Sequence, residues 1–405
     1  MSRYLVVSDC YPADLSHGRH LRVHHLCLEL ARKHECYLVD FEGKGEAPAS
    51  GMFAGRISLP SVPAKSHRSL RRMFRMSNAR YLELSAPKWW RQAVHDCQVA
   101  FDRWECSAAL SFAPSIAEVT AALNGFRVLD WLDSATLTYR RRLAVSGTGA
   151  TLPKRWMAAL QARRQREREA ALVNCFDLTV TIAEPDRRVL LDVAGIAPER
   201  VRVVPNGVDE NALCAGADSL PRGQSIIFWG NLDFPPNASA VRWFHRSVWQ
   251  PHLAGRGLEW HIAGAGATAD IKALRSEPGI ILHGFVDDLY GLARRQGLMV
   301  NPMVEGSGLK NKVLESFAIG LPVVSTSMGV EAIDAEDGSY CRIADRPAEF
   351  AAAVLDLLSR PAHAEALSVA ARQLVYARYT WAVAGQALAE LLGVAGDRRV
   401  QASAA

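Results

Sequence analysis

The sequence predicts an α/β fold built from two parallel β-sheets, one in each half of the chain. The 405 residues are 49% hydrophobic, which suffices for two domains of about 200 residues with sizeable cores. Short apolar runs alternate with longer helical patterns, as in parallel sheets whose strands are joined by covering helices. The run that begins at Val201 stops at Pro205 and the Asn206-Gly207 turn, so the chain is expected to divide near residue 205.

In the first half, short aliphatic and β-branched runs predict buried strands, and apolar residues spaced three or four apart predict helices. These elements are expected at Tyr4–Ser8, Leu21–Lys33 (helix), Glu35–Phe41, Ala108–Phe112, Phe126–Leu129 and Leu178–Ile182. The segment Leu152–Val173 predicts a long amphipathic helix, with Trp156, Leu160 and Leu172 toward the protein and its arginines mostly toward solvent.

The second half repeats the same alternation. Its elements are expected at Ser225–Trp229, Ala240–Trp249 (helix), Glu259–Ala263, Ile280–Leu282, Gly297–Asn301 and Pro322–Ser325. Helical periodicity then runs from Ala364 to Val394, ahead of a tail of small residues that is expected to fray. The predicted domains are therefore residues 1–205 and 206–375, followed by a C-terminal helix and tail over 376–405.

Positive charge is concentrated in the first half. Residues 1–205 hold 30 Lys and Arg against 21 Asp and Glu, whereas residues 206–405 hold 17 against 21. The stretch Lys65–Arg91 interleaves arginines with Trp89 and Trp90. Such a stretch either docks on anionic lipid headgroups or forms a solvated helix face whose apolar residues pack inward, and both readings stay open. No base-reading module is recognisable, so nucleic acid is not an expected partner.

The cysteines and the N-terminus indicate a cytoplasmic protein. The eight cysteines are scattered without a C-x-x-C pair, which argues against a disulfide framework or a zinc knuckle. The apolar run at the N-terminus is too short for a signal peptide and ends at Asp9. Since no window approaches the roughly 18 apolar residues of a membrane span, any membrane contact is expected to be peripheral, at the inner face.

The most informative segment runs from Asn301 to Thr326 and predicts a strand, a glycine-bearing loop, a helix and a second strand. Backbone N–H groups at the start of the helix, together with the helix dipole, favour a bound pyrophosphate. Lys310 and Lys312 supply cations at that end, and Glu315, one turn further, can accept from ribose hydroxyls. The segment therefore predicts a nucleotide site.

The letters of this segment, G-S-G-L-K-N-K-V-L-E-S-F-A-I-G-L-P-V-V-S-T, resemble the donor-site signature of the retaining group 1, family 4-like glycosyltransferases with the GT-B fold. The order of W-G-N-L-D-F-P-P-N, H-I-A-G-A-G and H-G-F-V-D-D before it is also similar to that family. The resemblance implies two Rossmann-like domains facing each other across a cleft. It further implies a nucleotide diphosphate sugar as co-substrate in the C-terminal domain, with neither a cofactor nor a bound metal.

Two site residues are carried over directly, and two features depart from the family. Glu315 matches the second glutamate of a Glu-x7-Glu pair, which binds the donor ribose, and Lys312 would face the diphosphate. The first glutamate should stand eight residues before Glu315, where this chain has Ser307. Either Glu305 still approaches the donor sugar as a catalytic group or that role is lost. The Arg and Lys that usually follow the first strand of the donor domain are also missing, and Lys310 or the N-terminal Arg19 and Arg22 are expected to compensate.

Further donor contacts are expected at strand ends, because ligands of open α/β sheets bind outside the carboxyl ends of the strands. The resemblance and this placement together nominate Gly18, Asn231, Gly264, Phe285, Val286, Gly306, Ser307, Gly308 and Leu309. The alternatives are an ordinary turn for the Gly264 segment and core packing for Phe285.

On the acceptor side, Asp130 and Asp133 come just past a strand and suit a group that touches an acceptor hydroxyl. The alternative is a helix cap made by Asp133 or Ser134. His17 or His20 is expected to donate to the sugar or the phosphate. A metal site at the clustered histidines is not favoured, since no third ligand follows at a suitable spacing.

The sequence therefore predicts a glycosyltransferase of polysaccharide or glycolipid assembly, acting on a glycan or lipid-linked acceptor. Two other readings share the nucleotide site: an epimerase or hydrolase of nucleotide sugars, and a non-catalytic nucleotide-sugar-binding scaffold. Uridine and guanosine donors are both open.

Overall fold

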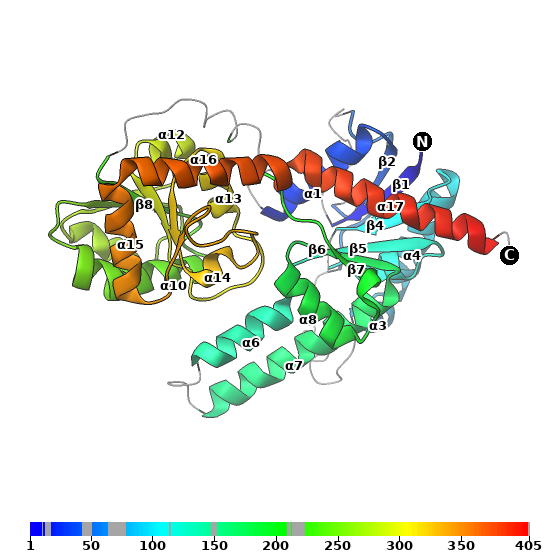
Figure 1. The fold of residues 1–405 in the computed structure, drawn as a ribbon. Coiled ribbons are helices and arrows are strands. Elements are labelled where there is room, and N and C mark those ends of the chain that lie inside the picture. The colour runs from blue at the N-terminus through cyan, green and yellow to red at the C-terminus, as the bar shows by residue number, and fades with distance from the viewer. Residues whose placement is uncertain are drawn as a thin grey trace. The chain divides into compact units, whose positions relative to one another are not determined.

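The structure is a computed structural model that describes residues 1–9, 11–12, 18–42, 51–63, 78–112, 115–146, 152–208, 212 and 223–403. The chain forms two compact units. Unit 1 comprises residues 1–205 together with 384–405, and unit 2 comprises residues 206–383. Each unit is an α/β body with its own parallel sheet (Figure 1).

Unit 1 is built on a seven-stranded parallel sheet with the order β3-β2-β1-β4-β5-β6-β7. Its strands are β1 (Arg3–Ser8), β2 (Glu35–Asp40), β3 (Gly55–Ser58), β4 (Ala108–Ser111), β5 (Phe126–Leu132), β6 (Leu178–Thr181) and β7 (Val201–Val203). The central strand β1 is buried along almost its whole length, which explains its near-continuous apolar sequence. The short edge strand β3 was not predicted, because all four of its residues are half-buried and carry no continuous apolar run.

The helices of unit 1 cover this sheet and fill its core. They are α1 (Gly18–Ala31), α3 (Asn78–Ser85), α4 (Pro87–Arg103), α5 (Ala117–Ala121), α6 (Ala135–Ser146), α7 (Leu152–Cys175) and α8 (Glu184–Ala194). One core cluster joins α4 to β1 and β2 through Phe101, Leu5 and Val39. A second joins α7 and α8 to β5 through Val173 and Leu190.

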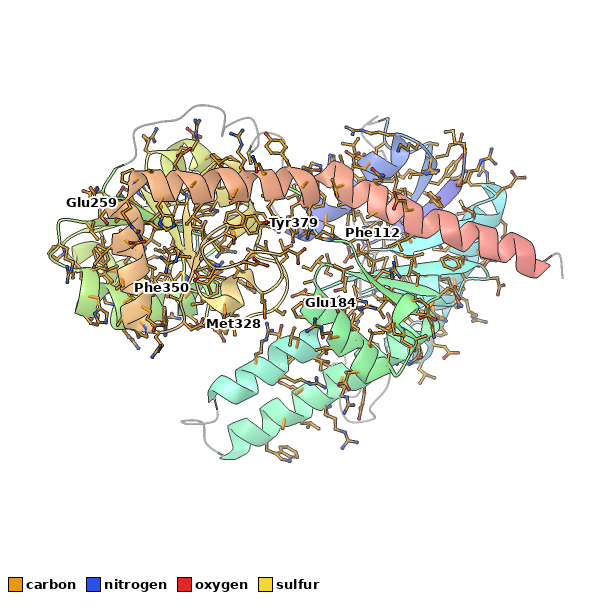
Figure 2. All side chains as sticks on the ribbon, viewed as in Figure 1. Phe112, Glu184, Glu259, Met328, Phe350 and Tyr379 are labelled. Carbon is orange, nitrogen blue, oxygen red and sulfur yellow. The ribbon has the colours of Figure 1, made fainter. Side chains whose placement is uncertain are left out.

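Unit 2 is built on a six-stranded parallel sheet with the order β10-β9-β8-β11-β12-β13. Its strands are β8 (Ser225–Trp229), β9 (Glu259–Ala263), β10 (Ile280–Gly284), β11 (Leu298–Asn301), β12 (Val323–Ser325) and β13 (Arg342–Ile343). The main helices are α10 (Pro235–Trp243), η2 (Phe244–Leu253), α11 (Ala269–Ala273), α12 (Leu289–Arg294), α13 (Asn311–Ala318), α14 (Ser327–Val330) and α15 (Pro347–Ser359). An aromatic cluster of Phe244, Trp249, Trp260 and Phe350 lies in its core. Figure 2 labels Phe350 on α15. The predicted α/β fold with two parallel sheets is confirmed.

The C-terminal helical pattern forms two helices rather than one. Helix α16 spans Pro361–Arg378 and α17 spans Trp381–Ser403. Between them Thr380 forms a β-bridge with Val208. From Ala384 onward α17 belongs to unit 1, where Gly385 lies so close to α1 that a Cβ there would meet the Glu29 Cβ at 2.2 Å.

One prediction for α7 is wrong. Leu172 is buried as expected, but the Trp156 side chain is 69% exposed. The reason is that α7 packs against α5 and α8 through its second half, whereas Trp156 lies in its opening turns. Apolar periodicity locates a face of a helix but not the length over which a neighbour covers it.

Candidate functional site

Two glycine turns at the carboxyl end of the unit 2 sheet fix the floor of the predicted nucleotide site. Gly230 follows β8 and Gly264 follows β9, and a Cβ on Gly264 would stand 1.9 Å from the Gly230 carbonyl oxygen. Gly266 has φ +78°, and a Cβ there would meet the Asp233 backbone nitrogen at 2.9 Å. The Leu232 N–H donates to the Ala265 carbonyl at 2.8 Å. Only glycine permits this close approach of two strand-ending turns.

Lys312, in the first turn of α13, directs its amine to this floor. Its Nζ donates to the Asn237 Oδ1 at 2.6 Å and lies 4.3 Å from the centre of the Phe228 ring. A Cβ on Gly230 would stand 3.0 Å from the same Nζ. Burial, together with the neighbouring charge of Lys310, lowers the pKa of Lys312 to about 7. The chain thus holds a desolvated amine beside the turn from which the expected Arg and Lys are missing.

Glu315 is oriented by a residue that the sequence analysis did not single out. The Trp229 Nε1–H at the end of β8 donates to the Glu315 Oε2 at 3.1 Å. Trp229 is buried, whereas Glu315 is half-buried. The indole therefore holds one carboxylate oxygen in place, and the only sequence signal for this contact is the aromatic residue that ends the strand.

The glycine-bearing loop before α13 is held by its own lysine. The Lys310 Nζ donates to the carbonyl oxygens of Ser307 and Gly308, at 2.7 and 2.8 Å. Gly306 and Gly308 adopt positive φ angles of 115° and 68°. Leu309 is buried beneath the loop. Lys310 therefore stabilises the loop through carbonyl contacts.

Glu305 bonds to α10. The Glu305 Oε1 accepts a hydrogen bond from the Ser239 Oγ at 2.5 Å.

Asn231 stabilises the turn after β8. Its Oδ1 accepts from the Asp233 N–H at 3.0 Å. The side chain of Asn231 thereby closes the turn, and its backbone carbonyl oxygen accepts from the Asn237 Nδ2 at 2.8 Å.

The start of α13 is suited to an anion. The N-cap residue Lys310 makes no side-chain hydrogen bond to the first backbone N–H groups of the helix. Together with Lys312 these N–H groups form a positive end at the carboxyl edge of the sheet.

Phe285 and Val286 follow β10 at the same edge. The Phe285 side chain is 76% exposed, which excludes the alternative of core packing, while Val286 is half-buried. An exposed phenyl ring at a strand end is available to cover a base.

In unit 1, the predicted site residues Arg22 and Asp130 bind each other. The Arg22 Nε donates to the Asp130 Oδ2 at 2.9 Å and its Nη2 lies 2.8 Å from the same oxygen. Both side chains are buried, and the Arg22 Nη1 also reaches the Pro205 carbonyl oxygen at 3.4 Å. Arg22 thus has a carboxylate as its partner.

Two buried carboxylates fix the turn after β5. The Glu169 carboxylate accepts from the Trp131 Nε1 at 3.2 Å and from the Ser134 Oγ at 2.9 Å, and the Asp186 Oδ1 accepts from the Ser134 N–H at 2.7 Å. Leu132, the last residue of β5, has φ +61°, a conformation that residues other than glycine rarely adopt. The Ser134 Oγ also accepts from the Leu137 N–H at 3.2 Å, as a helix cap does, while Asp133 is exposed.

The histidines of α1 lie in a region with no metal cluster among the described residues. His20 is half-buried, and the His24 Nδ1 lies 3.1 Å from the Pro12 carbonyl oxygen. Gly18 begins the helix. His17 lies outside the described residues, and nothing is described of the Arg19 side chain.

The basic stretch Lys65–Arg91 is described only in part. Its arginines up to Arg80 fall outside the described side chains. Trp89 donates its Nε1–H to the Pro60 carbonyl oxygen at 3.0 Å, and Trp89 and Trp90 both pack against the core. The described tryptophans therefore follow the packing alternative.

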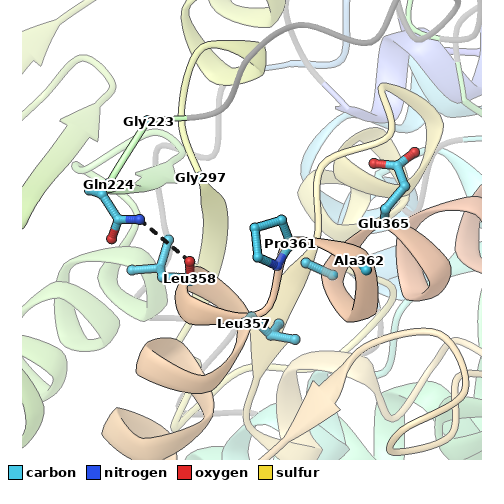
Figure 3. Close-up of a pocket in the computed structure, with 9 residues that line it drawn as sticks. Gly223, Gln224, Gly297, Leu357, Leu358, Pro361, Ala362 and Glu365 are labelled. Carbon is cyan, nitrogen blue, oxygen red and sulfur yellow. Dashed lines mark hydrogen bonds between the residues drawn. The ribbon is translucent and has the colours of Figure 1, made fainter.

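A cavity of about 400 Å³ in unit 2 lies away from these residues (Figure 3). Gly223 and Gly297, which line it, precede β8 and β11, so it opens at the amino ends of the strands. The carboxyl edge is therefore the better candidate for the nucleotide.

Comparisons with known proteins concern the family and the fold of the chain. Residues 223–360 match the family model "Glycosyl transferases group 1". In structure, the chain is similar to a sucrose-phosphate synthase from Thermosynechococcus elongatus, with 14% identity, 100% of each chain covered and a TM-score of 0.65. It is also similar to Anabaena HepE in complex with UDP-glucose, with 13% identity, 97% of this chain and 100% of that chain covered and a TM-score of 0.63. No curated protein matches the chain in sequence.

The similar structures extend over nearly the whole chain and establish the expected GT-B fold, with its two sheets. The family match contains every residue of the nucleotide site described above, from Phe228 to Glu315. The chain thus has the GT-B fold, and its residues 223–360 match the group 1 glycosyl transferases, which supports the enzyme class that the sequence predicts.

Proposed function

We propose that this protein transfers a sugar, with retention of configuration, from a nucleoside diphosphate sugar bound at the carboxyl edge of the unit 2 sheet. The observation that carries the proposal is the arrangement at the start of α13. There Lys312 approaches the glycine floor while Glu315, one turn later, is oriented by Trp229. A cation and a carboxylate at this spacing match a diphosphate and a ribose.

In this proposal the chain acts mainly by stabilising the leaving diphosphate. The charge that develops on the departing phosphate is met by Lys312 and the N–H groups at the start of α13. The rigid glycine floor fixes these groups before the reaction, so little reorganisation accompanies the charge transfer. The site needs no cofactor beyond the nucleotide sugar.

A uridine nucleotide is our first candidate for the donor. Among the similar structures, Anabaena HepE is found in complex with UDP-glucose, and a second complex of that protein holds UDP and glucose. For the acceptor we propose a glycan or lipid-linked sugar of polysaccharide or glycolipid assembly, in line with the similar lipopolysaccharide outer core galactosyltransferase WaaB.

Calorimetric titration of UDP and GDP into wild type, Glu315→Ala and the control Glu336→Ala tests the donor site. Glu336 is an exposed carboxylate of the same unit. We expect micromolar UDP binding by wild type and control and at least a tenfold loss in Glu315→Ala. Binding that ignores Glu315 would place the nucleotide elsewhere.

The reaction is then followed with UDP-sugars and candidate acceptors by NMR of the anomeric proton. A product with the anomeric configuration of the donor supports retaining transfer. Release of free sugar, or epimerised donor, without an acceptor product would favour the hydrolase or epimerase reading. Tight binding without turnover would favour the scaffold.

A further inference from the structure

The helical hairpin of α6 and α7 in unit 1 carries more positive charge than the whole protein. Residues 135–175 contain nine Lys and Arg against two Glu, a formal charge of +7, whereas the chain as a whole carries +5. One of the two acids, Glu169, is buried and bonds to the turn after β5. It therefore offsets little of the charge at the hairpin surface.

The cations and apolar residues of α7 share one exposed face. Trp156, Ala159, Arg163 and Arg166 follow one another at spacings of three or four residues, and all four are exposed. Residues at this spacing lie on one side of a helix. The apolar part lies in the first turns, where Trp156 is 69% exposed, and Arg163 follows Trp156 about two turns later on the same face. Met157, 56% exposed, is the neighbour of Trp156 about 100° further round the helix.

This end of the hairpin is distant from the packed part of unit 1. The contacts of α7 with the core begin with the buried Glu169, which bonds to Trp131, and continue with Leu172, more than three turns after Trp156. Figure 1 shows α6 and α7 extending as a pair beyond the sheet of their unit. The exposed tryptophan is thus displayed on a projecting element that has no packing need for it.

We propose that the α6–α7 hairpin docks on the surface of a bilayer that contains anionic lipids, with Trp156 and Met157 inserted among the headgroups. Each cation near such a surface adds about 1 kcal/mol of attraction, and tryptophan settles at the interface between headgroups and acyl chains. Apolar residues ahead of a cationic helix face meet both requirements, and a nucleic acid or an acidic protein would leave Met157 without an apolar environment. Among the described residues, no helix is long and apolar enough to cross a membrane.

Co-sedimentation of the full chain with vesicles tests the proposal. We expect binding to vesicles of phosphatidylcholine mixed with phosphatidylglycerol, little binding to phosphatidylcholine alone, and release by salt. The double variant Trp156→Ser/Met157→Ser is expected to weaken binding on the order of tenfold, and Arg163→Glu/Arg166→Glu by a similar factor or more. Val369→Ser, which alters an exposed apolar residue of unit 2, is the matched control and should bind as wild type.

UDP affinity and the melting temperature of each variant are measured alongside, because the hairpin proposal does not depend on sugar transfer. Trp156→Phe provides a second measurement in a minimally altered fold: brominated phosphatidylglycerol should quench wild-type fluorescence more than that of this variant. Failure to bind anionic vesicles, binding unchanged by all hairpin variants, or equal quenching of wild type and Trp156→Phe would each overturn the proposal. So would a Trp156-dependent dimer that forms without lipid.

Discussion

The turn after β5 in unit 1 and the turn after β8 in unit 2 occupy equivalent ends of two parallel sheets, but their polar groups have different partners. Near the carboxyl end of β5, Asp130 is matched by the buried Arg22, and after the strand Ser134 bonds to the buried carboxylates of Glu169 and Asp186. After β8, Gly230 lies against Gly264 of the turn after β9, and the nearby Lys312 amine bonds to a neutral amide oxygen.

The difference is the one we expect between a turn that supports the fold and the turn that we propose binds the donor. In unit 1 the charges compensate each other inside the protein, so their hydrogen bonds serve the fold. In unit 2 a cation is desolvated beside glycines without a carboxylate in contact with its amine, so an anion would improve its electrostatic environment. The group 1 family match covers the second turn and not the first.

The largest expected effect is on unit 1 and concerns stability alone. Arg22→Met leaves the Asp130 carboxylate buried without its cation, and we expect a loss of about 3–5 kcal/mol in the free energy of unfolding. Urea denaturation measures the loss, and UDP titration of the folded fraction should give wild-type affinity. Arg32→Met, at an exposed arginine just after the end of the same helix, is the control. Wild-type stability with weakened UDP binding would mean that Arg22 serves the donor and that the two turns do not differ as argued.

The nucleotide segment was predictable from sequence because its chemistry is local. The strand, glycine loop, helix start and the residues Lys312 and Glu315 all lie within one continuous stretch. The partners that orient them are distant: Asn237 precedes Lys312 by 75 residues and Trp229 precedes Glu315 by 86. Local patterns contain no information about such contacts.

The supporting network of unit 1 was missed for the same reason. Glu169 reads in sequence as a charge that offsets the arginines of its helix, yet it is buried against Trp131, 38 residues away. Asp130 was expected just past a strand ending at Leu129, but β5 continues to Leu132 and Asp130 lies inside it. Its burial with Arg22 depends on a pairing over 108 residues. The sequence locates a strand, whereas the partners of the polar groups near its end depend on tertiary contacts.

The second prediction concerns the amine of unit 2. Lys312→Met is expected to weaken UDP binding by about 100-fold, the loss of one strong charge-assisted contact. The same change removes a cation whose charged form is disfavoured by desolvation, so the variant should unfold at a higher temperature than wild type at pH 7. Calorimetry and thermal melting measure the two effects, with the exposed Lys272→Met as control. Weaker UDP binding together with a higher melting temperature would sharpen the contrast with Arg22. A loss of both UDP affinity and stability would remove that contrast.

The pKa of Lys312 near 7 predicts a pH dependence of binding. Above pH 7 the free amine is increasingly neutral, whereas a bound diphosphate favours its charged form. Binding then takes up a proton, and UDP affinity should fall by up to about tenfold per pH unit between pH 7 and 9. Titrations in buffers of different ionisation enthalpy detect the proton directly. A flat profile in wild type would show that Lys312 is charged before the nucleotide binds, and Lys312→Met should be flat in either case.

A smaller effect is expected at the residue that orients Glu315. Trp229→Phe removes the Nε1–H donor while keeping most of the ring, and UDP affinity should fall about fivefold. Because the contact serves the ribose hydroxyls, affinity for 2′,3′-dideoxy-UDP should stay unchanged. Trp243→Phe, in the same unit, is the control. An equal loss for both nucleotides would indicate a general packing defect.

The smallest effect belongs to a titratable pair at the edge of the unit 2 sheet. The His261 Nδ1 lies 2.9 Å from the His283 Nε2, and burial lowers the pKa of both histidines below the ordinary value of 6.5. Folded-state pKa values below the unfolded value give stability that is present above about pH 6.5 and lost as the pH falls below it. Urea unfolding at pH 7.5 and 5.5 should show a loss of under about 1 kcal/mol that His283→Asn reduces and the exposed His95→Asn does not. UDP affinity at pH 7.5 should be the same in both variants. Protonation of the His261–His283 pair is therefore expected to change stability alone. Protonation of Lys312 is expected to change UDP affinity, because Lys312 lies beside the glycine turns where we propose the diphosphate binds.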